Sequence, residues 1–114
     1  MAIDAYFCEV NCYVRENSFI AKIAASKLKA GSVAIVIGKT IHLHNATRAE
    51  LLMNQRWLRH EIAHIRQFRH HGFLNFVLLY LWESLLNGYH NNKYEIEARA
   101  AENNDRICDG IVIE

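Results

Sequence analysis

The sequence predicts an α+β fold that is mostly helical, with a short β-hairpin before a central helix and another helix after it. The chain has no proline, so glycines and capping residues are the main signals that end its helices. Apolar residues recur at helical spacing over much of its length. Two β-rich runs, SVAIVI and TIHLH, are separated only by Gly38 and Lys39. With 114 residues, the chain is expected to form one domain, residues 1–114.

Composition and charge narrow the class of protein without naming a partner. Apolar residues make up 52% of the chain and charged residues 22%, which is typical of a globular protein. The formal net charge is +1, with acids and bases mixed along the chain, so no nucleic acid partner or anionic membrane is expected. The first ten residues, MAIDAYFCEV, have no basic stretch leading into an apolar run, and a cytoplasmic location is therefore expected.

The three cysteines are odd in number and lack the spacing of a disulfide framework. Cys8 and Cys12 lie four residues apart, a spacing compatible with metal binding or a disulfide. Together with Cys108 they are interpreted as thiols that stay reduced inside the cell, with Cys8 and Cys12 buried or half-buried.

The first elements are a helix and a hairpin. Residues 15–30 form an amphipathic pattern that Gly31 is expected to end, and its apolar stripe is Phe19, Ile20, Ile23, Ala24 and Leu28. The two β-rich runs follow, and glycine as the first of two connecting residues predicts a type II′ hairpin turn.

Three further helices and a strand are predicted. One extends from about Thr47 to His70, with Asn45 as its expected N-cap and with an apolar stripe of Leu51, Leu52, Leu58, Ile62, Ile65 and Phe68. Gly72 and Gly88 bound the next, whose apolar run is too short to span a bilayer, so a core helix is preferred. The alternative is a helix that buries its apolar residues against a partner or a membrane surface. The last begins near Asn91 or Asn92, and residues 111–114 predict a short strand or extended tail.

A possible metal-binding motif lies in the middle of the central helix. His60, Glu61 and His64 spell H-E-x-x-H, and residues four apart on a helix share a face, so the two imidazoles can converge on one ion. Glu61 is rotated by about a hundred degrees from His60, beside such an ion, where a general base is needed. The alternative is a solvated helix face that happens to carry these residues.

A catalytic zinc site needs a third protein ligand. The candidates are His70, His71, His90, His42, His44, Glu83, Glu95, Glu97 and Glu102. Glu95 is favoured by its position in the first turn of the last helix. Against it, Asn92 and Glu95 also fit a capping box, in which the carboxylate binds the backbone instead. His42 and His44 share a strand face and are better interpreted as exposed or hydrogen-bonded histidines.

Two motifs carry a family resemblance. HEIAHIRQ at 60–67 followed by YEIEARA at 94–100 resembles the paired signature of gluzincin metallopeptidases, and the length and element order are similar to the small single-domain minigluzincins. The resemblance implies a zincin-like domain with His60, His64 and Glu95 as zinc ligands and Glu61 as the catalytic base. It implies hydrolysis of a peptide or protein substrate, which would pair with the TIHLH strand, and a latent or zymogen-like state.

The chain also departs from that family. Position 99, where an acidic residue often orients a zinc histidine, holds Arg99, and Glu97 or Glu102 are the candidates to replace it. Tyr89 and His90 are the candidates to stabilise an oxyanion, and Cys8 or Cys12 a minor candidate for a blocking thiolate.

Three hypotheses follow. The first is a zinc metallopeptidase, and the second is a non-catalytic, zinc-stabilised interaction module that forms a homodimer. The third is a metal-free helical protein.

Overall fold

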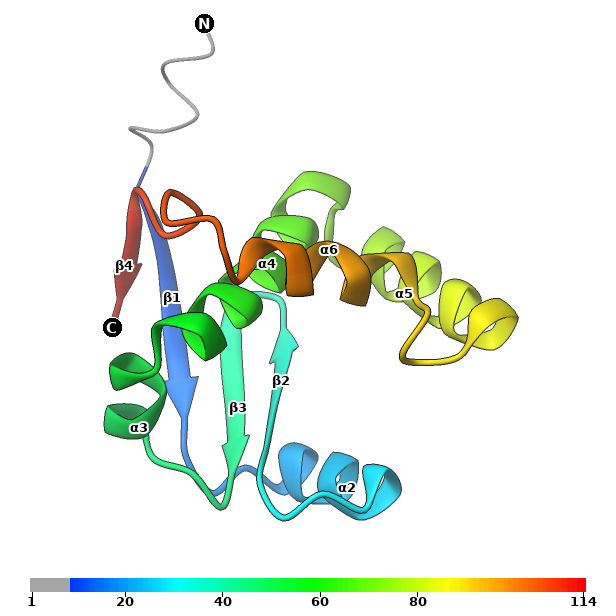
Figure 1. The fold of residues 1–114 in the computed structure, drawn as a ribbon, viewed down its shortest axis with the longest axis horizontal. Helices are drawn as coiled ribbons and strands as arrows, with labels where there is room; N and C mark the ends of the chain where they lie inside the picture. The colour runs from blue at the N-terminus through cyan, green and yellow to red at the C-terminus, as the bar shows by residue number, and fades with distance from the viewer. Residues whose placement is uncertain (1–8) are drawn as a thin grey trace, which may run out of the picture.

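A computed structural model describes residues 9–114 and contains a four-stranded sheet with helices packed on it (Figure 1). The strands are β1 (Val10–Arg15), β2 (Val33–Ile37), β3 (Thr40–His44) and β4 (Ile111–Ile113), and their order across the sheet is β2-β3-β1-β4. The helices are α2 (Phe19–Leu28), α3 (Arg48–Met53), α4 (Gln55–His71), α5 (Phe73–Asn87) and α6 (Lys93–Ala101). The predicted α+β class, with a hairpin before the H-E-x-x-H helix and Glu95 on a later helix, is confirmed.

The hairpin sits at one side of the sheet. β2 and β3 pair antiparallel, with Ile37 opposite Thr40 across the turn. Gly38 has φ +65° while Lys39 does not have a positive φ, which fits the predicted type II′ turn. β1 is parallel to both β3 and β4. β3 is therefore an inner strand, whereas β2 has a free edge.

The core lies between the sheet and α4. Alternate residues of β3, Ile41 and Leu43, are fully buried against Ile62 and Ile65 of α4. His42 points to the other face, where its Nδ1 lies 2.9 Å from the hydroxyl of Ser18, so it is a hydrogen-bonded histidine as predicted. Ser18 also caps α2 by accepting from the backbone N–H of Ala21.

The predicted apolar stripe of α2 is not the face that it buries. Its buried residues are Ala21 and Ala25, while Phe19 is 74% exposed, and Ile20, Ile23 and Leu28 are also exposed. The helix ends before Gly31, because Lys29 adopts the left-handed conformation and its N–H binds the carbonyls of Ala25 and Ser26. Helical spacing identified the residues that share a face, but the small alanines pack closest to the sheet.

The helix predicted from Thr47 to His70 is two helices. Asn45 does not cap it and has φ +56°. Thr47 caps α3 in a capping box with Glu50, and Asn54 ends that helix and caps α4 by accepting from the N–H of Trp57. Five residues of the predicted stripe, Leu51, Leu58, Ile62, Ile65 and Phe68, are buried, and the sixth, Leu52, is partly buried against the core.

The last two helices end close to the predicted positions. Gly72 and Gly88 bound α5, and Asn92 caps α6 by accepting from the N–H of Tyr94. β4 confirms the predicted terminal strand. Only Phe76 of α5 is buried, so α5 is not the core helix that its composition predicted. Among residues 9–114, no helix has the length and apolarity needed to cross a membrane.

Candidate metal centre

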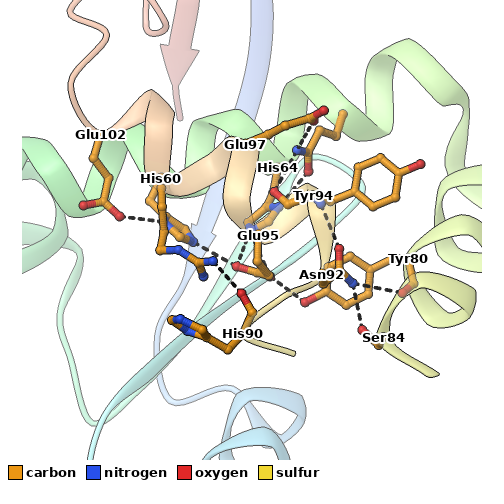
Figure 2. A network of polar contacts seen from close by, with 12 residues as sticks. His60, His64, Tyr80, Ser84, His90, Asn92, Tyr94, Glu95, Glu97 and Glu102 are labelled. Carbon is orange, nitrogen blue, oxygen red and sulfur yellow. Dashed lines mark hydrogen bonds and ion pairs between the residues drawn. The ribbon is translucent and has the colours of Figure 1, made fainter. Parts of the chain in front are cut away.

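The H-E-x-x-H motif lies in the middle of α4, as predicted, and the side chains of His60 and His64 point toward α6 (Figure 2). His64 and Glu61 are buried, and His60 is partly buried. The two imidazole ring centres are 5.1 Å apart, as expected for positions four apart on one helix.

Glu95 from the first turn of α6 lies between the two histidines (Figure 2). Its Oε1 is 3.1 Å from His60 Nε2, and its Oε2 is 3.2 Å from His64 Nε2. Its carboxylate does not form a capping box, because Asn92 Oδ1 accepts from Tyr94 and Glu95 is turned into the centre. The residue predicted to be the third ligand is therefore next to the other two.

The outer nitrogens of both rings are held by other side chains. His60 Nδ1 lies 2.9 Å from Glu102 Oε2, and His64 Nδ1 lies 2.8 Å from Gln67 Oε1. Gln67 in turn donates to the carbonyl of Tyr94 and to Glu97. Ligand histidines of metal sites are typically oriented in this way, with the second nitrogen bonded to an oxygen acceptor. Both Nε2 atoms are thereby directed at one point.

Glu102, rather than residue 99, supplies the orienting carboxylate. Arg99 donates to the carbonyl of His90, away from this role. Arg56 lies 3.2 Å from Glu102 Oε1, and Arg59 donates to the Glu102 carbonyl, so the end of α6 is tied to α4. Of the two replacements considered from the sequence, Glu102 contacts His60, whereas Glu97 contacts Gln67.

Tyr80 of α5 is a site residue that the sequence did not reveal. Its hydroxyl donates to Glu95 Oε2 at 2.5 Å, and its ring meets that of His64 edge-on. It sits in an apolar helix with no motif around it, so only its reach into the centre identifies it. Tyr89 lines the same cleft, and His90 contributes its backbone carbonyl to Arg99.

Asn92 joins the helices that carry these groups. Its side chain is fully buried, and its Nδ2 donates to the carbonyl of Tyr80 and to the hydroxyl of Ser84 while its Oδ1 caps α6 (Figure 2). The same residue therefore holds α5 and the first turn of α6 in register, and both Tyr80 and Glu95 depend on it.

The electrostatics of the centre follow from three carboxylates around two histidines. Burial lowers the pKa of His60, but Glu95, Glu61 and Glu102 outweigh it and raise this pKa to about 9. Burial raises the pKa of Glu61 to about 7, against the opposing effect of His64 and His60. Burial raises the pKa of Glu95, but the hydrogen bonds from both histidines and Tyr80 have the larger effect. The pKa of Glu95 therefore falls well below its ordinary range.

The chemistry of these donors fits a divalent transition metal. One ligand atom from each of His60, His64 and Glu95 lies within 4.8 Å of the others, and no other group of this kind is found among residues 9–114. Two imidazoles and one carboxylate are the ligand set of one type of catalytic zinc site, which leaves a fourth position free. Deprotonation of the histidines would accompany binding.

A cleft of about 350 Å³ leads to the centre. Its polar end is formed by His60, Glu61, His64 and Glu95, and its apolar walls come from α2, β2 and α5. All five residues of β2 line it, whereas those of β3 do not. The prediction that the TIHLH strand pairs with a substrate is thus wrong, because both edges of β3 are paired. The free edge at the cleft belongs to β2.

The cysteines do not enter this cleft as far as the structure describes them. Cys12 is fully buried in the core, and Cys12 and Cys108 are free thiols. The suggestion that Cys12 supplies a blocking thiolate is therefore wrong. Cys8, the other candidate, lies outside the described residues.

Comparisons with protein-family models, with curated proteins and with solved structures found no match to this chain. The resemblance to gluzincins accordingly depends on the two motifs and on the centre that their residues form.

Proposed function

We propose that the protein is a zinc-dependent metallopeptidase of gluzincin type. The observation that carries the proposal is the convergence of His60, His64 and Glu95 on one point at the polar end of a cleft that Glu61 also lines. Glu61 follows His60 in the chain and is not part of the ligand group, so its carboxylate remains free to accept a proton.

Each residue has a role in peptide hydrolysis. Zinc, when bound, would supply a Lewis acid that makes water acidic and polarises a carbonyl. Glu61 takes the proton of the attacking water, whose oxygen adds to the peptide carbonyl carbon, and then passes this proton to the departing amine nitrogen. Tyr80 donates its one hydroxyl hydrogen to Glu95 Oε2 and so holds this ligand in position. Tyr89, which also lines the cleft, is the candidate donor to the oxyanion that develops.

The free edge of β2 is the proposed place for the substrate backbone. An extended peptide can add to an exposed sheet edge through main-chain hydrogen bonds. Val33–Ile37 lines the cleft that ends at Glu61, so a peptide paired with β2 would run past the centre. This assignment replaces the one made to the inner strand β3.

The test compares Glu61→Gln with wild type in zinc content and peptide hydrolysis. We expect about one zinc per chain in both proteins, and loss of hydrolysis by at least about 100-fold in the variant, because a general base typically contributes that much. Glu9→Gln, the same change on an exposed residue just before β1, is the matched control and should keep both properties. Equal hydrolysis by Glu61→Gln and wild type would contradict the proposal.

A non-catalytic, zinc-stabilised interaction module is the second candidate. The observation that favours it is the large apolar exposure of α5, which a hydrolase does not require. It predicts a bound metal that stabilises the fold, with no peptide cleaved by wild type under any condition that retains zinc.

A further inference from the structure

One helix of the protein exposes a continuous apolar stripe. The α5 stripe consists of Leu74, Leu78, Leu81, Trp82, Leu85 and Leu86, each more than half exposed. Their spacing at i, i+4, i+7 or i+8, and i+11 or i+12 places them along one side of the helix. Phe76 and Tyr80 lie on the other side, toward the core and the centre. No described part of the chain covers the α5 stripe.

The exposed apolar surface continues across the mouth of the cleft onto α2. Leu81 of α5 and Leu28 of α2 both line the cleft, and they are 59% and 47% exposed. Phe19, Ile20 and Ile23 of α2 are exposed as well. We call these four α2 residues and the α5 stripe the apolar rim. Figure 1 shows α2 and α5 on the same side of the sheet as its free edge, β2.

Basic side chains accompany the apolar rim. α2 and its cap carry three exposed lysines, Lys22, Lys27 and Lys29, and no acid. Lys39 and Arg69 line a hollow with Phe73 at the start of α5, and Lys93 follows its end. The one acid between residues 69 and 93 is Glu83, which accepts from the N–H of Lys93 and from Asn87. The overall charge of +1 therefore hides a local basic excess on α2 and its cap.

Charge decides between the possible occupants. In a symmetric dimer built on the apolar rim, each copy would bring the same basic excess to the interface, and α2 has no acid to pair with the lysines of the other copy, which is unfavourable. A bilayer with anionic headgroups accepts apolar side chains at its boundary and attracts the lysines around them. Tryptophan, here Trp82, is enriched at that boundary. Because α5 is too short to span the bilayer, it would lie along the surface.

We propose that the apolar rim docks the protein onto a bilayer surface that contains anionic phospholipids, with α5 along the interface and the cleft opening toward the lipid. Docking of this kind uses residues outside the metal centre, and it does not depend on the proposed hydrolysis.

The experiment measures co-sedimentation of the full chain with vesicles of equal parts phosphatidylcholine and phosphatidylglycerol. We expect binding together with a blue shift of tryptophan emission that Trp82→Phe removes. The double variant Leu78→Asn/Leu85→Asn should bind about tenfold more weakly or worse, because two apolar side chains no longer enter the lipid. Met53→Asn changes an 85% exposed apolar residue on α3 and is the matched control, which should bind as wild type does.

Lysine variants test the electrostatic part. Lys22→Gln/Lys27→Gln should bind the anionic vesicles more weakly, by about fivefold for each lysine removed, and vesicles of phosphatidylcholine alone should bind wild type weakly. Circular dichroism melting of every variant checks that it is folded. Absence of binding to anionic vesicles, or equal binding by the folded Leu78→Asn/Leu85→Asn variant, would overturn the proposal. So would a concentration-dependent dimer, seen by sedimentation velocity, that the double variant abolishes without any vesicle binding.

Discussion

At the scale of single residues, Glu102 determines how His60 is presented to the centre. Its carboxylate is 2.9 Å from His60 Nδ1, and it leaves Nε2 directed at the ligand group. We expect Glu102→Gln to lower zinc affinity by about 10–100-fold, since a ligand histidine loses a charged acceptor. Competition with a chromophoric chelator measures the affinity, and Glu9→Gln, on an exposed residue before β1, should leave it within about twofold of wild type. Unchanged affinity in Glu102→Gln would contradict this role.

The reactivity of Cys12 is a second prediction at the residue scale. Burial is the main reason that its pKa rises from 9.0 to about 11. At pH 8 the thiolate fraction, and with it the alkylation rate, should then be about 100-fold lower than for a free cysteine, before burial slows access further. Iodoacetamide labelling followed by fragment-ion mass spectrometry measures each thiol separately. Protein unfolded in urea should react normally, and rapid labelling of Cys12 in folded protein would show that its strand opens.

Sequence reasoning found those site residues that share a motif and missed those that reach the site alone. His60, Glu61 and His64 follow from helical spacing, and Glu95 from its place in the first turn of α6. Tyr80 could not be found in this way, because its role depends on the angle at which α5 meets α4 and α6. Whether Glu97 or Glu102 orients a histidine likewise could not be decided from the sequence, because it depends on where the end of α6 lies relative to α4.

At the scale of elements, Asn92 connects α5 to α6. It is fully buried, and it makes hydrogen bonds to Tyr80, Ser84 and Tyr94. Asn92→Ala removes a helix cap, worth about 1 kcal/mol, and leaves buried partners unpaired, so we expect a total loss of about 2–4 kcal/mol in the free energy of unfolding. Urea denaturation measures it. Asn91→Ala, its exposed neighbour, should change this free energy by less than about 0.5 kcal/mol.

Elements were predictable where local signals decide them. The hairpin turn, the glycines that bound α5 and the cap of α6 are all read from adjacent residues. Asn54 was missed because an asparagine between two helical stretches acts as a stop and a cap only if the chain turns there. β1 was not predicted at all, since its pairing to β3 and β4 joins residues far apart in the sequence.

At the scale of the whole molecule, the apolar residues of α2 and α5 were assigned to the core, whereas most of them are exposed. The predicted stripe of α2 and the apolar run of α5 are real, but periodicity shows which residues share a face and not what covers that face. The sheet and α4 already form the core, and α2 and α5 retain exposed apolar surface around the cleft. Core and binding surface are made of the same residue types, so only packing separates them.

The metal centre joins α4, α5 and α6, and zinc should therefore stabilise the whole fold. A ligand that binds only the native state stabilises it by about 4 kcal/mol at a concentration 1,000 times its dissociation constant. For a domain of this size that corresponds to a rise in melting temperature of roughly 10–20 °C over the chelator-treated protein. Glu95→Gln should lose most of this rise because it removes a charged ligand, whereas Glu9→Gln, on an exposed residue before β1, should retain it. Differential scanning calorimetry with zinc and with a chelator measures the three pairs of melting temperatures, one for each protein. Equal melting temperatures of wild type under both conditions would mean that the two histidines and Glu95 form a hydrogen-bonded cluster that the fold maintains without a metal.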